Sequence, residues 1–308
     1  MDMDLNETQS VIHDACSKLL ARRAGPARAR ELRKTDDFDR LLMIEMDEAG
    51  FLDLFYEPDA GPLAGALITE WAASAAALAP IGARVLVAPS VMGDRLPLVI
   101  AIADRTNLAA VRFAAEADLL ILVDGDEASV AGRGAFEATS VRTKFGFPMA
   151  RVENVQGTPL LASAGATVKR WWRVSLAAEI AGAARSAVDL TIRYLQDRVQ
   201  FDRPIASYQA IQHRLVECHV LADAAQWSMR EAAFHGAPAE LAAGAAVTAC
   251  EAAHRLFYEL HQLSGAIGFT SEYDLHLFTM RLQALRIEMN GVRGHARALV
   301  EARWPAAG

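Results

Sequence analysis

The sequence is poor in cysteine and aromatic residues and lacks any long apolar run. Three of its 308 residues are cysteines (Cys16, Cys218 and Cys250), and aromatic residues make up 7%. Three widely spaced thiols form neither an even disulfide framework nor a metal-ligand pattern, so we expect a reducing cytoplasm and no metal site. No apolar segment reaches the length of a membrane span, and we therefore expect no contact with a membrane.

Basic residues are in the minority. There are 31 Lys and Arg against 38 Asp and Glu, a net charge of -7. A nucleic-acid-binding protein usually carries a basic face, so this composition argues against that class. The N-terminal sequence MDMDLNETQ is acidic and polar, unlike an ordinary signal peptide.

Alanine and apolar residues at helical spacing are abundant. Hydrophobic residues make up 53% of the chain, and alanine favours helices over sheet. The spacing predicts helices over residues 5–22, 38–49 and 67–79. Asn6 or Thr8 is suited to cap the first helix, Gly50 ends the second and Pro80 follows the third.

The pattern changes to short β-prone segments between residues 95 and 150. LPLVIAIA, LLILVDG and residues 139–141 are separated by turn residues, which predicts four to six strands. Helical periodicity returns over residues 173–199, 206–234, 238–264 and 271–298, with short connections and with Gly265 as a C-cap. Small residues at 181–184 allow close helix approach. We predict a mostly α protein with an N-terminal helical domain (1–92), a small, truncated β-domain (93–165) and a C-terminal four-helix bundle (166–308).

The most distinctive stretch is RYLQDRVQFDRPIASYQAIQHRLV at residues 193–216. Pro204 interrupts the helix and biases Arg203 toward an extended backbone, and Ser207 is suited to cap the next helix. Two arginines and two amides near a helix start suit a phosphate or pyrophosphate group: Arg198, Gln200, Arg203 and Gln209. The same residues are also compatible with a polar loop between helices.

Two motifs resemble those of acyl-CoA dehydrogenases. RVQF-x-RPI-x-x-YQAIQH resembles the family pattern R-x-x-F-G-x-x-I-x-x-x-Q, and QLSGAIGFTSEY at 262–273 is similar to Q-x-x-G-G-x-G-[FY]-x-x-E-[YH]. The resemblance covers about residues 173–286 and implies the family's three-part fold of helices, β-domain and helices. The family's flavin-ring segment T-E-P-x-x-G-S-D is not found in the middle region.

The resemblance implies that FAD is the cofactor. In the family, the two motifs contact a flavin held mainly by the neighbouring subunit, and the matching positions here are Arg198, Gln200, Phe201, Gln209, Gln262 and Gly265. Two family glycines are replaced, by Asp202 and by Ala266. Both changes add bulk, and Asp202 adds a negative charge near the expected pyrophosphate, so we expect a weakened contact.

The usual catalytic base is missing. Dehydrogenation of an acyl thioester requires a base for the proton alpha to the carbonyl and a flavin for the beta hydride. The two glutamate positions known in the family correspond to Asn290 and Trp172, and neither side chain is a base. We interpret Glu288 as a solvated surface charge. For Glu179, the alternatives are a relocated base and a structural hydrogen-bonding role.

The resemblance therefore implies a subunit of a flavin-dependent acyl-CoA dehydrogenase. It is similar to the short, base-less subunit of heteromeric bacterial enzymes of steroid side-chain degradation, whose partner subunit carries the catalytic glutamate. A homo-oligomer is the alternative assembly, and acyl-CoA is the expected substrate. Two other hypotheses stay open: a non-catalytic interaction or scaffold protein on the same fold, and a self-sufficient dehydrogenase that uses Glu179 as its base.

Overall fold

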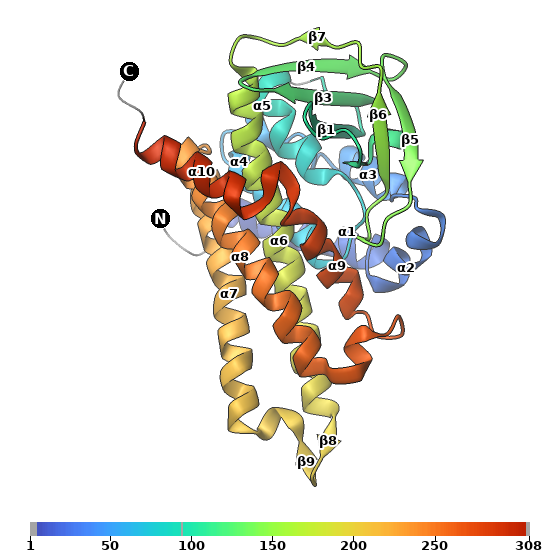
Figure 1. Cartoon of the computed structure of the whole chain (residues 1–308), viewed down its shortest axis with the longest axis vertical. Coiled ribbons are helices and arrows are strands. Elements are labelled where there is room, and N and C mark those ends of the chain that lie inside the picture. Colours follow the sequence, from blue (N-terminus) through green and yellow to red (C-terminus); the bar gives the residue numbers. More distant parts are fainter. Residues whose placement is uncertain (1–4, 94, 306–308) are drawn as a thin grey trace.

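Helices form both ends of the chain, and a small β region lies between them (Figure 1). The computed structural model describes residues 5–93 and 95–305. These observations confirm the predicted fold class. Within the described ranges, no helix is long and apolar enough to cross a membrane.

The N-terminal helices begin where the sequence offers a cap or a proline. Asn6 accepts a hydrogen bond from the backbone N–H of Gln9 and, with the Gln9 side chain, forms a capping box, as predicted for the first helix. Three helices carry proline in the first turn: α2, α4 and α5. Helix α2 was not predicted, because its polar sequence has no clear apolar periodicity, and α4 begins and ends earlier than predicted. The helices are α1 (Glu7–Arg23), α2 (Pro26–Thr35), α3 (Arg40–Glu48), α4 (Gly61–Ser74) and α5 (Pro89–Met92).

Two small sheets form the middle region. The first has the order β1-β3-β4-β7, with β1 and β3 parallel, and the second has the order β2-β6-β5 and is antiparallel. The three segments predicted as strands are confirmed as β1, β3 and β5. The predicted number of strands, four to six, was too low, because β2 and β7 are too short to show any periodicity. The strands are β1 (Ile100–Asp104), β2 (Val111–Arg112), β3 (Leu119–Asp124), β4 (Glu127–Gly132), β5 (Glu137–Val141), β6 (Met149–Glu153) and β7 (Thr158–Pro159).

Long helices build the C-terminal region: α6 (Ala164–Asp197), α7 (Gln209–Phe234), α8 (Ala239–Ser264), α9 (Leu275–Leu285) and α10 (Gly291–Arg303). The prediction of one helix over 271–298 was wrong. Met289, Asn290 and Gly291 all have positive φ angles (51°, 66° and 62°), which breaks the helix between α9 and α10. Gly265, with a φ angle of 64°, is the C-cap of α8 as predicted.

The break between α6 and α7 is a hairpin of β8 (Val199–Gln200) and β9 (Arg203–Pro204). The prediction that Ser207 caps α7 was wrong. Its hydroxyl donates to the carbonyl oxygen of Pro204, and Tyr208 occupies the N-cap position. The Ser207 hydroxyl is therefore bonded within the turn that precedes α7, and it does not cap the helix.

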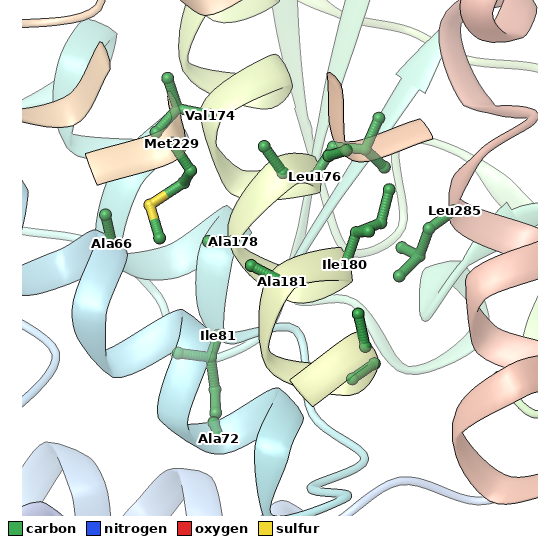
Figure 2. Packing of buried hydrophobic residues seen from close by; sticks show 14 of the residues in the cluster. Ala66, Ala72, Ile81, Val174, Leu176, Ala178, Ile180, Ala181, Met229 and Leu285 are labelled. Atoms are coloured by element: carbon green, nitrogen blue, oxygen red, sulfur yellow. The ribbon is translucent and has the colours of Figure 1, made fainter. Parts of the chain in front are cut away.

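Helix α6 forms the centre of the core. Its buried side chains, among them Leu176 and Ile180, pack between α4, α7 and α9 (Figure 2). The predicted close approach is confirmed at Gly182, where an added Cβ would lie 2.0 Å from the carbonyl oxygen of Glu70 on α4. The Glu70 side chain is buried and ion-paired with Arg230 of α7 at 3.0 Å. These contacts fix α4 and α7 against α6.

Replacing Gly182 with alanine should destabilise the protein by about 1–3 kcal/mol, because a Cβ would overlap the α4 backbone. The matched control is Gly244→Ala in α8, where the nearest atom to an added Cβ is 4.0 Å away. The control should be neutral or gain up to about 1 kcal/mol of helix propensity. Urea unfolding curves of both variants test this, and equal midpoints would contradict the close packing of α4 on α6.

Candidate functional site

The residues predicted to bind the cofactor gather at one end of the bundle. All are exposed, and they lie at the C-terminal end of α6, on the hairpin β8–β9, at the start of α7 and at the C-terminal end of α8: Arg198, Gln200, Phe201, Gln209, Gln262 and Gly265. Figure 1 shows the hairpin at the foot of the bundle. Near it, the rings of Tyr194 and Tyr273 lie 5.4 Å apart, and the Tyr273 hydroxyl donates to the carbonyl oxygen of Leu190. The fold therefore brings both motifs to the same end, and their role in binding stays a prediction.

The hairpin holds two residues in an unfavourable backbone conformation. Phe201 and Asp202 have φ angles of 55° and 66°, as in a two-residue type I′ turn, where Asn-Gly is preferred. A positive φ is a genuine outlier for a bulky residue, and such strain concentrates at functional sites. The Phe201 side chain is also 87% exposed. An exposed phenylalanine on a strained turn is a feature expected of a contact with another molecule.

Arg198 is available for an external ligand. Its side chain makes no hydrogen bond or ion pair with any residue in the described part of the chain, whereas the neighbouring Arg203 stacks on the Tyr208 ring at 3.9 Å. The replacement of a family glycine by Ala266 is tolerated by the backbone, because Ala266 is exposed and does not need a positive φ. The end of the bundle thus presents a free guanidinium among exposed amides.

A separate cavity lies where the β region meets the bundle. Its volume is about 190 Å³, and both positions that the family uses for its base line it: Trp172 of α6 and Asn290 of the α9–α10 connection. Glu179 and Glu288 line it as well. Glu179 lies near the middle of α6, and Arg198 is the residue directly after its C-terminal end. The 19 residues between these two positions correspond to about 28 Å along the helix. The cavity and the two motifs are therefore at distant places in one chain.

A buried ion-pair network closes one wall of the cavity. Arg112 of β2 lies 2.7 Å from Glu179 (Nη1 to Oε2) and 2.5 Å from Glu288 (Nε to Oε1), and the indole N–H of Trp172 donates to Glu288 at 3.0 Å. The side chains of the three charged residues are 15–17% exposed. The interpretation of Glu288 as a solvated surface charge was wrong. The positive φ angles at Met289 and Asn290 end the helix here, and Glu288 faces the cavity instead of the solvent.

Burial and the neighbouring charges act on this network in opposite directions. Burial and the nearby Glu179 raise the pKa of Glu288, and the Arg112 charge and the Trp172 N–H only partly oppose that rise. Burial lowers the pKa of Arg112, but the two carboxylates more than offset this, so its pKa is raised and it stays cationic. Glu179 accepts hydrogen bonds from both terminal nitrogens of Arg112, and both alternatives for its role stay predictions. Arg112 was not predicted, because β2 is short and lies far from Glu179 and Glu288 in the chain.

Comparison with known proteins confirms the predicted family resemblance. Residues 167–303 match the family model described as acyl-CoA dehydrogenase, C-terminal domain. The chain is 28% identical to acyl-CoA dehydrogenase IpdE2 of Mycobacterium tuberculosis (strain H37Rv), over 97% of this chain and 98% of that protein.

Solved structures show the same fold. A chain of the ChsE4-ChsE5 complex from Mycobacterium tuberculosis is similar over 100% of both chains, with a TM-score of 0.86 at 19% identity. A chain of the Tcur3481-Tcur3483 steroid ACAD is similar over 96% of this chain and 98% of its own length, with a TM-score of 0.82 at 19% identity.

Replacing Arg112 with methionine should destabilise the protein by about 3–5 kcal/mol, because two buried carboxylates would lose their partner. The matched control is the triple variant Arg112→Met, Glu179→Gln, Glu288→Gln, which removes all three charges and should recover most of that loss. Chemical unfolding of the wild type and both variants measures the difference. A loss below 1 kcal/mol in Arg112→Met would show that the network contributes little.

Proposed function

We propose that this chain, a member of the acyl-CoA dehydrogenase family, is one subunit of a flavin-dependent acyl-CoA dehydrogenase and completes the FAD site of a partner subunit. The observation that carries this proposal is the separation within α6. The motif residues at Arg198 lie about 28 Å along the helix from the cavity at Glu179. A side chain cannot cover that distance, so the motifs of one chain serve the cavity of another chain.

The motif end fits the pyrophosphate and adenine part of FAD. Arg198 is free to bind an anion in a bidentate manner, and α7 begins at Gln209, so the N-terminus of this helix favours a negative group. The exposed amides of Gln200 and Gln262 and the Phe201 ring add hydrogen-bonding and apolar contacts. Asp202 opposes the pyrophosphate charge and makes the contact weaker than a glycine would. When bound, FAD supplies the acceptor for the hydride from the beta carbon of the acyl group.

The partner subunit supplies the base in this proposal. Asn290 and Trp172 occupy the positions of the family glutamates, and Arg112 holds both Glu179 and Glu288 in ion pairs. Either carboxylate would have to give up hydrogen bonds to the buried Arg112 guanidinium before it could act as the base. The structurally similar ChsE4-ChsE5 is a complex of two differently named chains, which supports a different chain as partner.

The substrate class is an acyl-CoA thioester. A steroid-derived acyl group is our proposal for its acyl part, because the similar Tcur3481-Tcur3483 structure is described as a steroid ACAD.

A self-sufficient homo-oligomeric dehydrogenase is the second candidate. Glu179 and Glu288 favour it, since both carboxylates line the cavity. In this case a carboxylate would leave Arg112 to take up the proton.

Arg198→Met should reduce the affinity of the assembled complex for FAD by about 10- to 100-fold, because a charged hydrogen bond contributes about 1.5–3 kcal/mol. Co-purification with the partner subunit and the flavin absorbance of the complex measure this. Arg151→Met, which removes an exposed arginine on β6, is the control and should keep the flavin. Unchanged flavin content in Arg198→Met would favour the non-catalytic scaffold alternative.

The chain purified alone should be colourless and should not oxidise acyl-CoA when FAD is added. The visible absorption spectrum, recorded before and after addition of acyl-CoA, tests this. A flavin spectrum that bleaches would support the self-sufficient enzyme. In that case, whichever of Glu179→Gln and Glu288→Gln abolishes bleaching while flavin stays bound identifies the base.

A further inference from the structure

Arg281 of α9 is a buried cation with unused hydrogen-bond donors. The residue is 3% exposed, and its Nη1 donates to the carbonyl oxygen of Ala77 at 2.9 Å. Its Nε and Nη2 are buried and have no partner among the described residues. Cζ of Arg281 lies 5.5 Å from the centre of the Phe147 ring, a cation–π contact that provides no acceptor for the N–H groups. A buried charge without an ion-pair partner costs several kcal/mol, so this arrangement favours a bound anion at these two nitrogens.

A second unpaired arginine lies beside it. Arg33 of α2 is half-buried and makes no hydrogen bond or ion pair with the described residues. Both arginines flank Gly146: an added Cβ there would lie 3.6 Å from Cγ of Arg281 and 4.0 Å from Cζ of Arg33. The nearby charges that act on the two guanidiniums are those of Asp36, Glu179 and Arg112.

Glu179 does not neutralise Arg281. Its two oxygens accept from Nη1 and Nη2 of Arg112, and no ion pair joins it to Arg281. Asp36 and Glu179 lie near enough to act on Arg33 and Arg281, but no ion pair joins either arginine to a carboxylate among the described residues. Burial, followed by the like charges of Arg33 and Arg112, lowers the pKa of Arg281 to about 10, which leaves it charged at neutral pH.

Arg281 lines a cavity of about 20 Å³ that is separate from the larger one and shares Glu179 with it. Other parts of its wall are apolar, including Ala72, Ile81 and Leu285, which Figure 2 labels. The Thr69 hydroxyl in the wall donates to the carbonyl oxygen of Gly65. This volume accommodates a group about the size of one water molecule.

We propose that Arg281 and Arg33 form a binding site for a small monovalent anion of halide size. Nε and Nη2 of Arg281 donate to the anion, Arg33 contributes charge from the half-buried side, and the bound anion supplies the ion-pair partner that Arg281 lacks. The cavity is too small for sulfate or phosphate. A carboxylate group is the other small anion with this chemistry, and formate tests it. The site is independent of the cofactor, because its residues lie in neither motif.

The test uses the full-length chain and bromide as the probe. Thermal unfolding midpoints are measured as sodium bromide replaces sodium gluconate at constant ionic strength, with formate and sulfate as parallel series. The wild type should show a saturable rise in midpoint with bromide and no saturable rise with sulfate. A saturable rise with formate as well would extend the site to carboxylates. Arg281→Met should abolish the bromide rise, and Arg33→Met should weaken the apparent affinity several-fold.

Arg151→Met, at an exposed position on β6, is the control and should behave like the wild type. General effects of bromide on stability shift all variants alike, so the difference between variants reports the site. Crystals soaked in bromide should show an anomalous peak within hydrogen-bond distance of Arg281. The absence of both this peak and the saturable rise would overturn the proposal. A bromide-dependent rise in Arg33→Met and Arg281→Met equal to that of the wild type would overturn it as well. If Arg281→Met does not fold, Arg33→Met and the bromide peak still decide the question.

Discussion

The rigid length of α6 is the constraint on which the functional arrangement depends. This helix packs against α4, α7, α8 and α9, and its residues are largely buried along the central part. Trp172 and Glu179, in the N-terminal half of α6, line the cavity, and Arg198 follows directly after its C-terminal end. Because hydrogen bonds within a helix fix its rise per residue, the chain cannot fold its own motif back onto its own cavity. In the proposed assembly, the motif of a second subunit meets this cavity.

Around the cavity, ion pairs between charged side chains hold separate elements together. Arg112 connects β2 with α6 and with the connection between α9 and α10, three segments that are far apart in the sequence. The positive φ angles at Met289 and Asn290 are part of the same arrangement, because they turn the chain where Glu288 meets Arg112. In the proposed assembly, the carboxylates of this chain are structural and the strained, exposed hairpin is the part that contacts the partner.

Sequence reasoning was most successful where a residue acts through local chemistry. Helical periodicity located α1, α3 and the long C-terminal helices, and Asn6 and Gly265 act as caps through bonds to their own neighbours. It failed at α2, whose polar sequence has no periodic pattern, and at Ser207, whose hydroxyl found a nearer acceptor. It also failed at the fourth bundle helix, where Met289 does not signal a left-handed backbone and the signal of Asn290 and Gly291 was overlooked.

By itself, the sequence determined the fold class, the resemblance to acyl-CoA dehydrogenases and the residues of both motifs, because periodicity and motif spacing are local properties of the chain. Only the tertiary structure decided how the charged residues are used. It buried Glu288 against Arg112, left Arg198 free, and placed Arg281 beside Arg33 without a counter-charge. The pairing of a charged side chain depends on elements that are distant in sequence, and a one-dimensional pattern does not contain those distances.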